Sequence, residues 1–269
     1  RPLRPPNHAL SHPLTAHVGR RPSSPAARAP RALRPDKVFL ELSALQTDLA
    51  ELQGNVAGEL RLVAVNTAQY MVPYLLRAFL DLHPKISVRV KVVNRATALQ
   101  RLNENNDDLV IMGMVPTDKP LVSLPFLDNE MVPVVPNEHP LLQQRTITPQ
   151  AFLDSQLLAR EPGSGSRLAL EQHCQQRRLR FSPSIEIGSN DAVKHAVIAG
   201  LGVAVLPRLS ILSELELGRL KVLSIEGFPL RRSFCVVHPQ AKHPTPAMQA
   251  FLDYIQQNIK QFERMFIHT

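Results

Sequence analysis

Apolar residues between positions 38 and 56 recur at alternating spacings of four and three. They are Val38, Leu42, Leu45, Leu49, Leu52 and Val56. This pattern is typical of a helix that pairs with a second helix, although a helix packed on its own domain has the same period. Gly58 comes where the pattern stops. We therefore predict a linker helix over 38–57 and favour a role for it in dimerisation.

From position 58 onward, short apolar runs alternate with segments of helical period. The first half predicts strands at 60–65, 86–93 and 109–112 and helices at 68–82 and 97–103. The second half predicts strands at 131–135, 157–159, 185–187, 203–206 and 233–237, with helices at 148–154, from 167, at 190–199 and from 246. This β-α-β order implies a parallel sheet flanked by helices. Two such α/β units place a small-molecule cleft between them, at strand carboxyl ends and helix N-termini.

Positive charge is concentrated near the N-terminus. The 269 residues carry a net charge of +8, and residues 1–36 hold seven arginines, eight prolines and a single acid, Asp36. We predict that 1–37 is a disordered tail, because proline at this density removes backbone donors and blocks helices. The tail is either a basic arm for DNA phosphates or an uninformative N-terminus, and its composition favours the second reading.

Several protein classes are not expected. No run approaches 18 apolar residues, so we predict no transmembrane helix, and the first residues lack the apolar core of a secretory signal. The chain does not begin with Met, which suggests a fragment or a processed product. Its two cysteines, Cys174 and Cys235, are too few for a disulfide framework. We expect free thiols and a cytoplasmic protein.

Three strand-to-helix junctions, at 66–69, 160–167 and 188–190, are rich in small polar residues. Glycines let a ligand approach the backbone, hydroxyls and free N–H groups donate to anions, and arginines add charge-assisted bonds to a phosphate or carboxylate. Helix capping explains any one junction, but three in one two-lobed chain favour a ligand site. The candidate residues are Asn66, Thr67, Gln69, Arg95, Arg160, Ser164, Gly165, Ser166, Arg167, Gly188, Ser189 and Asn190.

Catalytic chemistry is not expected. The loop at 163–166 fits neither a Walker motif nor a nucleophile elbow. His173, His195 and His238 each stand alone, so we predict no metal site. No group of residues supplies a nucleophile, a base and an oxyanion hole together. The sequence therefore predicts a binding protein without a catalytic cofactor.

Five segments carry a resemblance to a known family. They lie at 58–62, 74–84, 160–167, 199–207 and 246–254. In this order they resemble the effector-binding half of LysR-type transcriptional regulators, and the Gly-Ser-Gly loop with the strand at 199–207 is the specific pair. A narrower resemblance is to regulators of carbon-fixation (Calvin-cycle and Rubisco) operons. It rests on 108–113, 125–129, 188–190 and 222–232.

The family resemblance implies an α/β fold of two Rossmann-like lobes of the periplasmic-binding-protein type, preceded by the linker helix and the tail. Lobe I would comprise 58–129 plus 236–262, and lobe II 130–235. The resemblance implies that a co-inducer lies between the lobes and touches Asn66, Thr67, Thr97, 164–166 and 188–190. For the carbon-fixation group the implied effector is a phosphorylated metabolite or NADPH.

The resemblance also implies self-association into a dimer or tetramer and binding to operator DNA. The family's winged helix-turn-helix should precede the linker helix, where only the tail stands, and that tract is too short and too proline-rich for a three-helix reader. We therefore predict that this chain senses a ligand but does not recognise an operator. The alternatives are a solute-binding receptor of a transporter, an α/β enzyme, and a partner that pairs with intact regulators through the linker helix.

Overall fold

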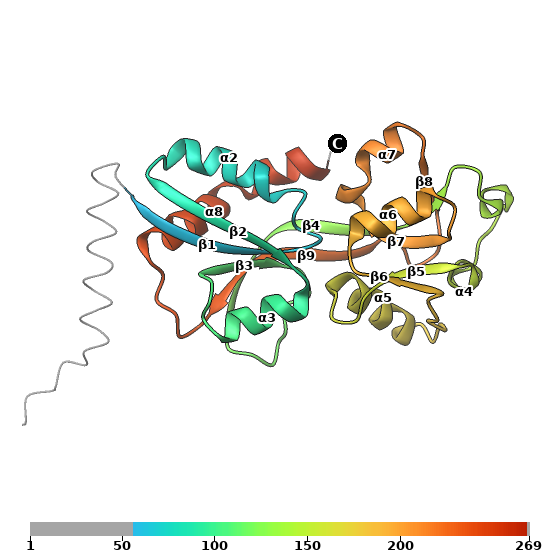
Figure 1. Ribbon diagram of the computed structural model, residues 1–269, viewed down its shortest axis with the longest axis horizontal. Helices are drawn as coiled ribbons and strands as arrows, with labels where there is room; N and C mark the ends of the chain where they lie inside the picture. Colours follow the sequence, from blue (N-terminus) through green and yellow to red (C-terminus); the bar gives the residue numbers. More distant parts are fainter. Residues whose placement is uncertain (1–55, 268–269) are drawn as a thin grey trace, which may run out of the picture.

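The computed structural model describes residues 56–267. The predicted tail and all but the last two residues of the predicted linker helix lie outside this range. The described chain forms two lobes joined by a pair of long strands, β4 and β9, which run side by side across the middle of the molecule (Figure 1).

Strands and helices alternate in the first part of the chain, as predicted. β1 (Gly58–Val65) pairs in parallel with β2 (Ile86–Val93) and β3 (Leu109–Met112), and α2 (Val72–Leu82) and α3 (Arg95–Asn103) connect them. α2 begins at Val72 rather than at 68, because 67–71 forms turns. α3 begins at Arg95 rather than at 97, because the Asn94 side chain accepts a hydrogen bond from the Thr97 N–H and caps the helix.

Two long antiparallel strands cross between the lobes. β4 (Leu121–Pro136) pairs with β9 (Leu230–Pro239), and its last third pairs with strands of the second lobe. The predicted strands at 131–135 and 233–237 are only parts of these elements, and the expectation of a purely parallel sheet is wrong. Pro125 and the polar residues 128–130 interrupt the apolar pattern of β4, and the strand accommodates Pro125 at a register shift.

The second lobe is inserted between β4 and β9. Its elements are η1 (Pro140–Gln143), α4 (Pro149–Asp154), β5 (Leu157–Arg160), α5 (Gly165–Gln176), β6 (Ile185–Ile187), α6 (Asn190–Ile198), β7 (Val203–Pro207), η2 (Arg208–Ser210), α7 (Leu212–Glu216) and β8 (Leu220–Val222). β5 pairs in parallel with β6 and β7, whereas β7 and β8 run antiparallel to β4. The sequence pattern did not predict α7 and β8, which are too short to show a period.

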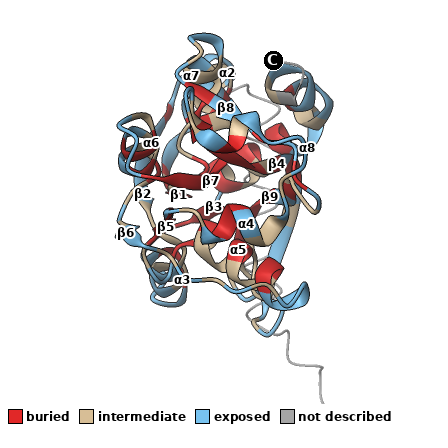
Figure 2. Ribbon diagram, turned by 90° about the vertical axis from the view of Figure 1, so that its right-hand side faces the viewer, coloured by how far each residue is buried: buried red, intermediate tan, exposed pale blue. Residues whose placement is uncertain are grey.

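All these strands belong to one sheet, in the order β2-β1-β3-β9-β4-β7-β5-β6 with β8 on β4. Helices cover the buried strands from both sides (Figure 2). One hydrophobic core combines residues from 56–127 with residues from 234–262, including Phe251 of α8 (Pro246–Ile267), whose ring packs edge-on against Phe79 at 5.0 Å. Two further cores use only residues from 131–230. We call the part around the first core lobe I and the part around the other two lobe II.

Candidate functional site

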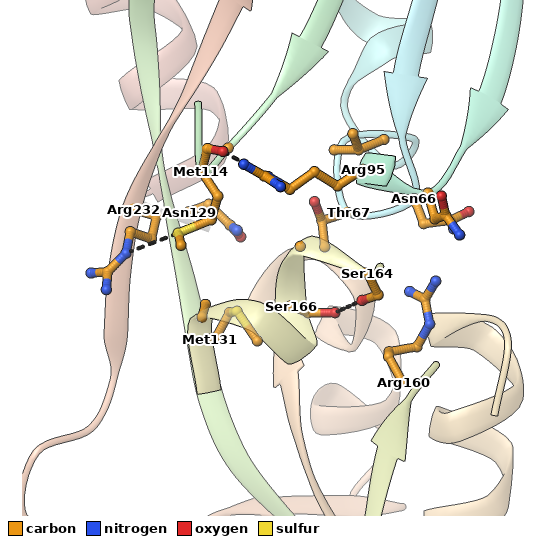
Figure 3. Close-up of a pocket in the computed structure, with 15 residues that line it drawn as sticks. Asn66, Thr67, Arg95, Met114, Asn129, Met131, Arg160, Ser164, Ser166 and Arg232 are labelled. Atoms are coloured by element: carbon orange, nitrogen blue, oxygen red, sulfur yellow. Dashed lines mark hydrogen bonds between the residues drawn. The ribbon is translucent and has the colours of Figure 1, made fainter. Parts of the chain in front are cut away.

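A cleft between the lobes gathers the ends of β1, β3 and β5 and the starts of α3 and α5 (Figure 3). Its volume is about 20 Å³, room for roughly one water molecule, so the cleft is narrow. Seven of the residues predicted from the sequence lie in it: Asn66, Thr67, Arg95, Arg160, Ser164, Gly165 and Ser166. The other lining residues are Val65, Asn94, Gly113, Met114, Asn129, Met131, Ala169 and Arg232.

The N-terminus of α5 forms one wall of the cleft. The Ser164 Oγ accepts a hydrogen bond from the Arg167 N–H at 3.3 Å and so caps the helix. The same hydroxyl lies 2.9 Å from the hydroxyl of Ser166, and both residues are buried. The first N–H groups of a helix have no partner within it and carry the positive end of its dipole. This wall therefore offers hydroxyl and N–H donors to an anion.

The Arg160 guanidinium lies buried beside that wall. Its Nε donates to Glu161 at 2.8 Å and its Nη1 to the Asn190 Oδ1 at 2.8 Å. Its Nη2 donates to Glu161 at 3.0 Å and to the Gly188 carbonyl at 3.3 Å. Four hydrogen bonds therefore fix its position, and most of its donors are already in use.

Two other arginines meet at Met114, which follows β3. The Arg95 Nε donates to the Met114 carbonyl at 2.7 Å, and burial lowers the Arg95 pKa. The Arg232 Nε donates to the Met114 sulfur at 3.3 Å. Thioether sulfur is a weak acceptor, so Arg232 gains little from this contact. Met114 itself has φ of +53°, a left-handed conformation that costs free energy in a residue with a side chain.

The crossing strands form the floor of the cleft. Asn129 and Met131 of β4 and Arg232 of β9 line it, and Asn129 lies directly opposite Arg232 in the antiparallel pair. These three residues were not predicted from the sequence, because its apolar pattern does not reveal the two crossing strands. The polar residues within the run 121–136 could have indicated them. A polar side chain such as Asn129 among apolar neighbours of a buried strand needs a polar partner, and a ligand cleft provides one.

The start of α3 and the loop before α5 hold the lobes together on one side of the cleft. The Ala96 N–H donates to the Gly163 carbonyl at 3.0 Å, and the Asn94 amide donates to Glu161 at 3.3 Å. Gly163 has φ of +88°, and a Cβ at this position would lie 3.0 Å from the Ala96 Cβ. Glycine is therefore required here both by the backbone and by the opposite lobe.

Asp191, at the start of α6, holds the lobes together at a second place. Its carboxylate accepts hydrogen bonds from the Gln69 amide at 3.5 Å and from the Tyr70 hydroxyl at 3.3 Å. Burial and the Asp191 charge raise the pKa of Tyr70 to about 12. Gln69, a predicted effector ligand, thus contacts the opposite lobe and does not line the cleft.

Five other predicted residues also lie outside the lining. Arg167 donates to Glu171 at 2.7 Å, pairs with Glu186 and lies over the Phe181 ring, so its guanidinium is engaged outside the cleft and its contact with an effector stays a prediction. Thr97 is exposed on α3. The remaining three, Gly188, Ser189 and Asn190, act behind the cleft: two hold Arg160, and Ser189 caps α6.

The charge of the lining is positive. It contains three arginines and no acidic residue, and the nearby Glu161 is paired with Arg160. Arginines, hydroxyls and a helix N-terminus together suit a phosphate or carboxylate. Within residues 56–267, no three side chains of the metal-binding types come together.

Known proteins are similar to this chain in sequence and in fold. The family model for the LysR substrate binding domain matches residues 53–260. A RuBisCO operon transcriptional regulator from Acidithiobacillus ferrooxidans is 35% identical over 247 residues, which cover 92% of this chain and 80% of the relative. The chain belongs to the LysR family of transcriptional regulators. The activator CmpR of Synechocystis is 37% identical over 214 residues, covering 80% of this chain and 70% of CmpR.

Solved structures agree with the family assignment. The regulatory domain of Synechocystis CcmR, in complex with 2-PG, superposes with a TM-score of 0.71 at 35% identity and covers 76% of this chain and 98% of that one. The effector-binding domain of QuiR in complex with shikimate, at 22% identity and a TM-score of 0.69, covers 77% of this chain and 99% of that one and supports the fold alone. These likenesses confirm the predicted family and the two-lobed fold.

Residues 56–267 therefore form the effector-binding domain of a LysR-type regulator. The relatives are transcriptional regulators and not enzymes, so neither the enzyme nor the transporter receptor is favoured. No helix between 56 and 267 is both long enough and apolar enough to span a bilayer.

Proposed function

We propose that this protein controls carbon-fixation genes in response to a small anionic metabolite bound between its lobes. One observation carries the ligand class: three arginines and the N-terminus of α5 line a cleft that contains no acidic residue. The identity with RuBisCO operon regulators supports the target genes. The two parts of the chain that close on the metabolite are the predicted lobe I, residues 58–129 with 236–262, and the predicted lobe II, residues 130–235.

The effector that best fits this lining is a phosphorylated carboxylic acid. Its two anionic groups would match the α5 wall, with Ser164 and Ser166, and the opposite side, with Arg95 and Arg232. NADPH is much larger than such an acid, and the cavity of about 20 Å³ would have to widen far more to admit it. The complex of CcmR with 2-PG supports a small ligand for this group of regulators.

Binding has to be coupled to movement of the lobes. The contacts from Ala96 to Gly163 and from Tyr70 to Asp191 close the cleft, so a ligand enters only after they separate. A ligand that bridges the two walls then favours one spacing of the lobes over another. This is a shift between existing conformations, which a regulator transmits without any chemical step.

A thermal-shift and calorimetry series tests the ligand class. The full chain is titrated with 3-phosphoglycerate, phosphoglycolate, phosphoenolpyruvate, ribulose bisphosphate, NADPH and inorganic phosphate. A ligand at a hundredfold excess over its Kd stabilises the folded state by about 2.7 kcal/mol. We expect one phosphorylated acid to bind, and Thr67→Val and Ser166→Ala to weaken it about tenfold.

The control for these variants is Ser184→Ala, because Ser184 is exposed and outside the cleft. It should bind as the natural chain does. Tighter binding of NADPH than of every phosphorylated acid, or equal losses in all three variants, would contradict the proposed site.

Self-association and DNA recognition are further parts of this proposal. We propose that the protein acts in the cytoplasm and pairs through the predicted linker helix, 38–57. Light scattering of Leu45→Lys/Leu49→Lys tests the pairing, and a drop in mass is expected because charge at the seam opposes it. Recognition of operator DNA, which the family resemblance implies, is tested in a gel-shift assay at moderate salt.

A further inference from the structure

Asn129 lies on the floor of the cleft with an unpaired side-chain oxygen. The residue is 5% exposed and lines the cleft. Among residues 56–267, its Oδ1 is one of three buried side-chain atoms without a hydrogen-bond partner. A buried polar atom left unpaired costs free energy, so its retention requires an explanation. Its position in the effector cleft supplies one: a bound molecule completes the hydrogen bond.

The chain's own neighbours do not supply that hydrogen bond. Arg232, directly opposite on β9, uses its Nε on the Met114 sulfur and its Nη1 on the Arg231 carbonyl. Arg95 uses its Nε on the Met114 carbonyl. Figure 3 shows Asn129 beside Arg232 and close to Met131, whose side chain has no donor to offer.

The surrounding charge decides which kind of donor fits. An ammonium group is repelled by Arg95 and Arg232, which flank the same part of the cleft. A protonated phosphate or carboxyl group is also disfavoured, because nearby positive charges lower the pKa of an acid. A neutral donor remains, and in a phosphorylated carboxylic acid that donor is a hydroxyl group.

We propose that Asn129 is a specificity residue that recognises a hydroxyl group on the anionic effector. The effector is thus a hydroxylated phosphorylated acid, with its anionic groups on the arginines and on α5 and its hydroxyl on Asn129. This inference rests on the proposed function, since it places the same ligand in the same cleft. It adds the requirement that the effector carries a hydroxyl group, which the positive charge of the lining does not impose.

The test compares 3-phosphoglycerate with its 2-deoxy analogue, which lacks only the hydroxyl. Calorimetry measures both ligands on the unaltered chain, on Asn129→Leu and on Asn137→Leu. The Leu side chain is close to Asn in size but has no acceptor. Asn137 is exposed in the turn after β4 and is not part of the cleft, so the second variant controls for the substitution itself.

We expect the natural chain and Asn137→Leu to bind 3-phosphoglycerate about tenfold more tightly than the analogue, the factor typical of one hydrogen bond. In Asn129→Leu the two affinities should agree within about twofold. Without ligand, Asn129→Leu should melt no lower than the natural chain, since it removes an unpaired oxygen. A large fall in melting temperature would mean that the residue has a structural role, and would overturn the inference.

Other outcomes separate this inference from the proposed function. If both ligands bind the natural chain equally, or if phosphoglycolate binds more tightly than 3-phosphoglycerate, the hydroxyl requirement is wrong and the anion site stands. The amide then presents its Nδ2 to an anionic oxygen instead. If none of these phosphorylated acids binds, the proposed effector class is wrong and the role of Asn129 falls with it.

Discussion

The Ala96 N–H donates a hydrogen bond to the Gly163 carbonyl across the cleft, at 3.0 Å. Each partner belongs to a different lobe, and each lies at a helix N-terminus that borders the cleft. The bond joins two main-chain groups, so its strength depends on backbone position and not on side-chain chemistry. The spacing of the lobes is therefore sensitive to any atom added between these residues.

Gly163→Ala should weaken the closed state. Its φ of +88° disfavours any residue with a side chain, and the new Cβ would lie 3.0 Å from the Ala96 Cβ. We expect a loss of about 2 kcal/mol in the free energy of unfolding by urea, from backbone strain and the contact together. Gly200→Ala is the matched control, because Gly200 has φ of +79° and open space around it. Gly200→Ala should lose only about 1 kcal/mol of unfolding free energy. Equal losses in the two variants would show that the contact between Gly163 and Ala96 is not tight.

Arg160→Ala and Arg167→Ala should differ, although sequence reasoning treats them alike. The first removes the ion-pair partner of Glu161 and the hydrogen bond to the buried Asn190 Oδ1, and should cost about 3 kcal/mol. The second breaks partly exposed pairs and should cost about 1 kcal/mol. Calorimetry below the melting range should show effector affinity reduced more than about tenfold in the first variant and within about twofold of normal in the second. An equal loss of affinity would place Arg167 in the cleft.

Alkaline pH should loosen the contact between Tyr70 and Asp191. Burial and the carboxylate raise the pKa of Tyr70 to about 12, whereas an unfolded tyrosine ionises near pH 10. The folded state thus keeps a proton that the unfolded state has lost, and this stabilisation is complete below about pH 10 and disappears as the pH rises to about 12. Because the hydroxyl is partly solvated, we expect Tyr70→Phe to remove only about 1 kcal/mol of this pH dependence.

Absorbance titration of tyrosine provides the second measurement. Asp191→Asn should lower the Tyr70 pKa, and it should stay above 10 because burial, the larger cause, remains. An unchanged titration in this variant would show that Asp191 does not act on Tyr70.

Asp108→Asn should destabilise lobe I at neutral pH and much less in acid. Burial alone would raise the pKa of Asp108, but hydrogen bonds from Arg61 and Lys242 outweigh it and hold the pKa below its usual value. The charged form therefore stabilises the fold above about pH 4, and this contribution is lost as the pH falls through the lowered pKa. We expect a difference of about 3 kcal/mol at pH 7 in urea unfolding. Asp128→Asn, at an exposed position, should stay within about 0.5 kcal/mol.

The parts of the site that follow from local sequence were predictable. Asn66 and Thr67 directly follow β1, Ser164 caps α5 and Ser166 lies in its first turn, so each lies at a strand end or a helix start that short patterns identify. In a doubly wound arrangement such ends meet at one edge of the sheet. The two walls of the cleft could therefore be assigned before the structure was known.

The floor and the orientation of the arginines could not be predicted. Asn129 and Arg232 are neighbours only because β4 and β9 pair antiparallel across more than a hundred residues of chain, and Pro125 hides the first of these strands. Arg167 directly follows the cleft residue Ser166, but its place on the next side of α5 turns it toward Glu171 and Glu186. The Glu171 pair is local, one helical turn along α5, but Glu186 and the pairing of Asn129 with Arg232 are distant in sequence and do not follow from local patterns.

The insertion of lobe II between the crossing strands also sets an order of events during synthesis. Every core residue of lobe II lies within 131–230, one continuous stretch of chain. Lobe I needs Phe234, Phe251 and Phe262 to complete its core, and these leave the ribosome only after all of lobe II. Since domains fold as units while the chain emerges, lobe II is complete while lobe I still exposes the apolar face of β1 and α2. The last helix, α8, thus closes the first-made half of the protein at the very end of translation.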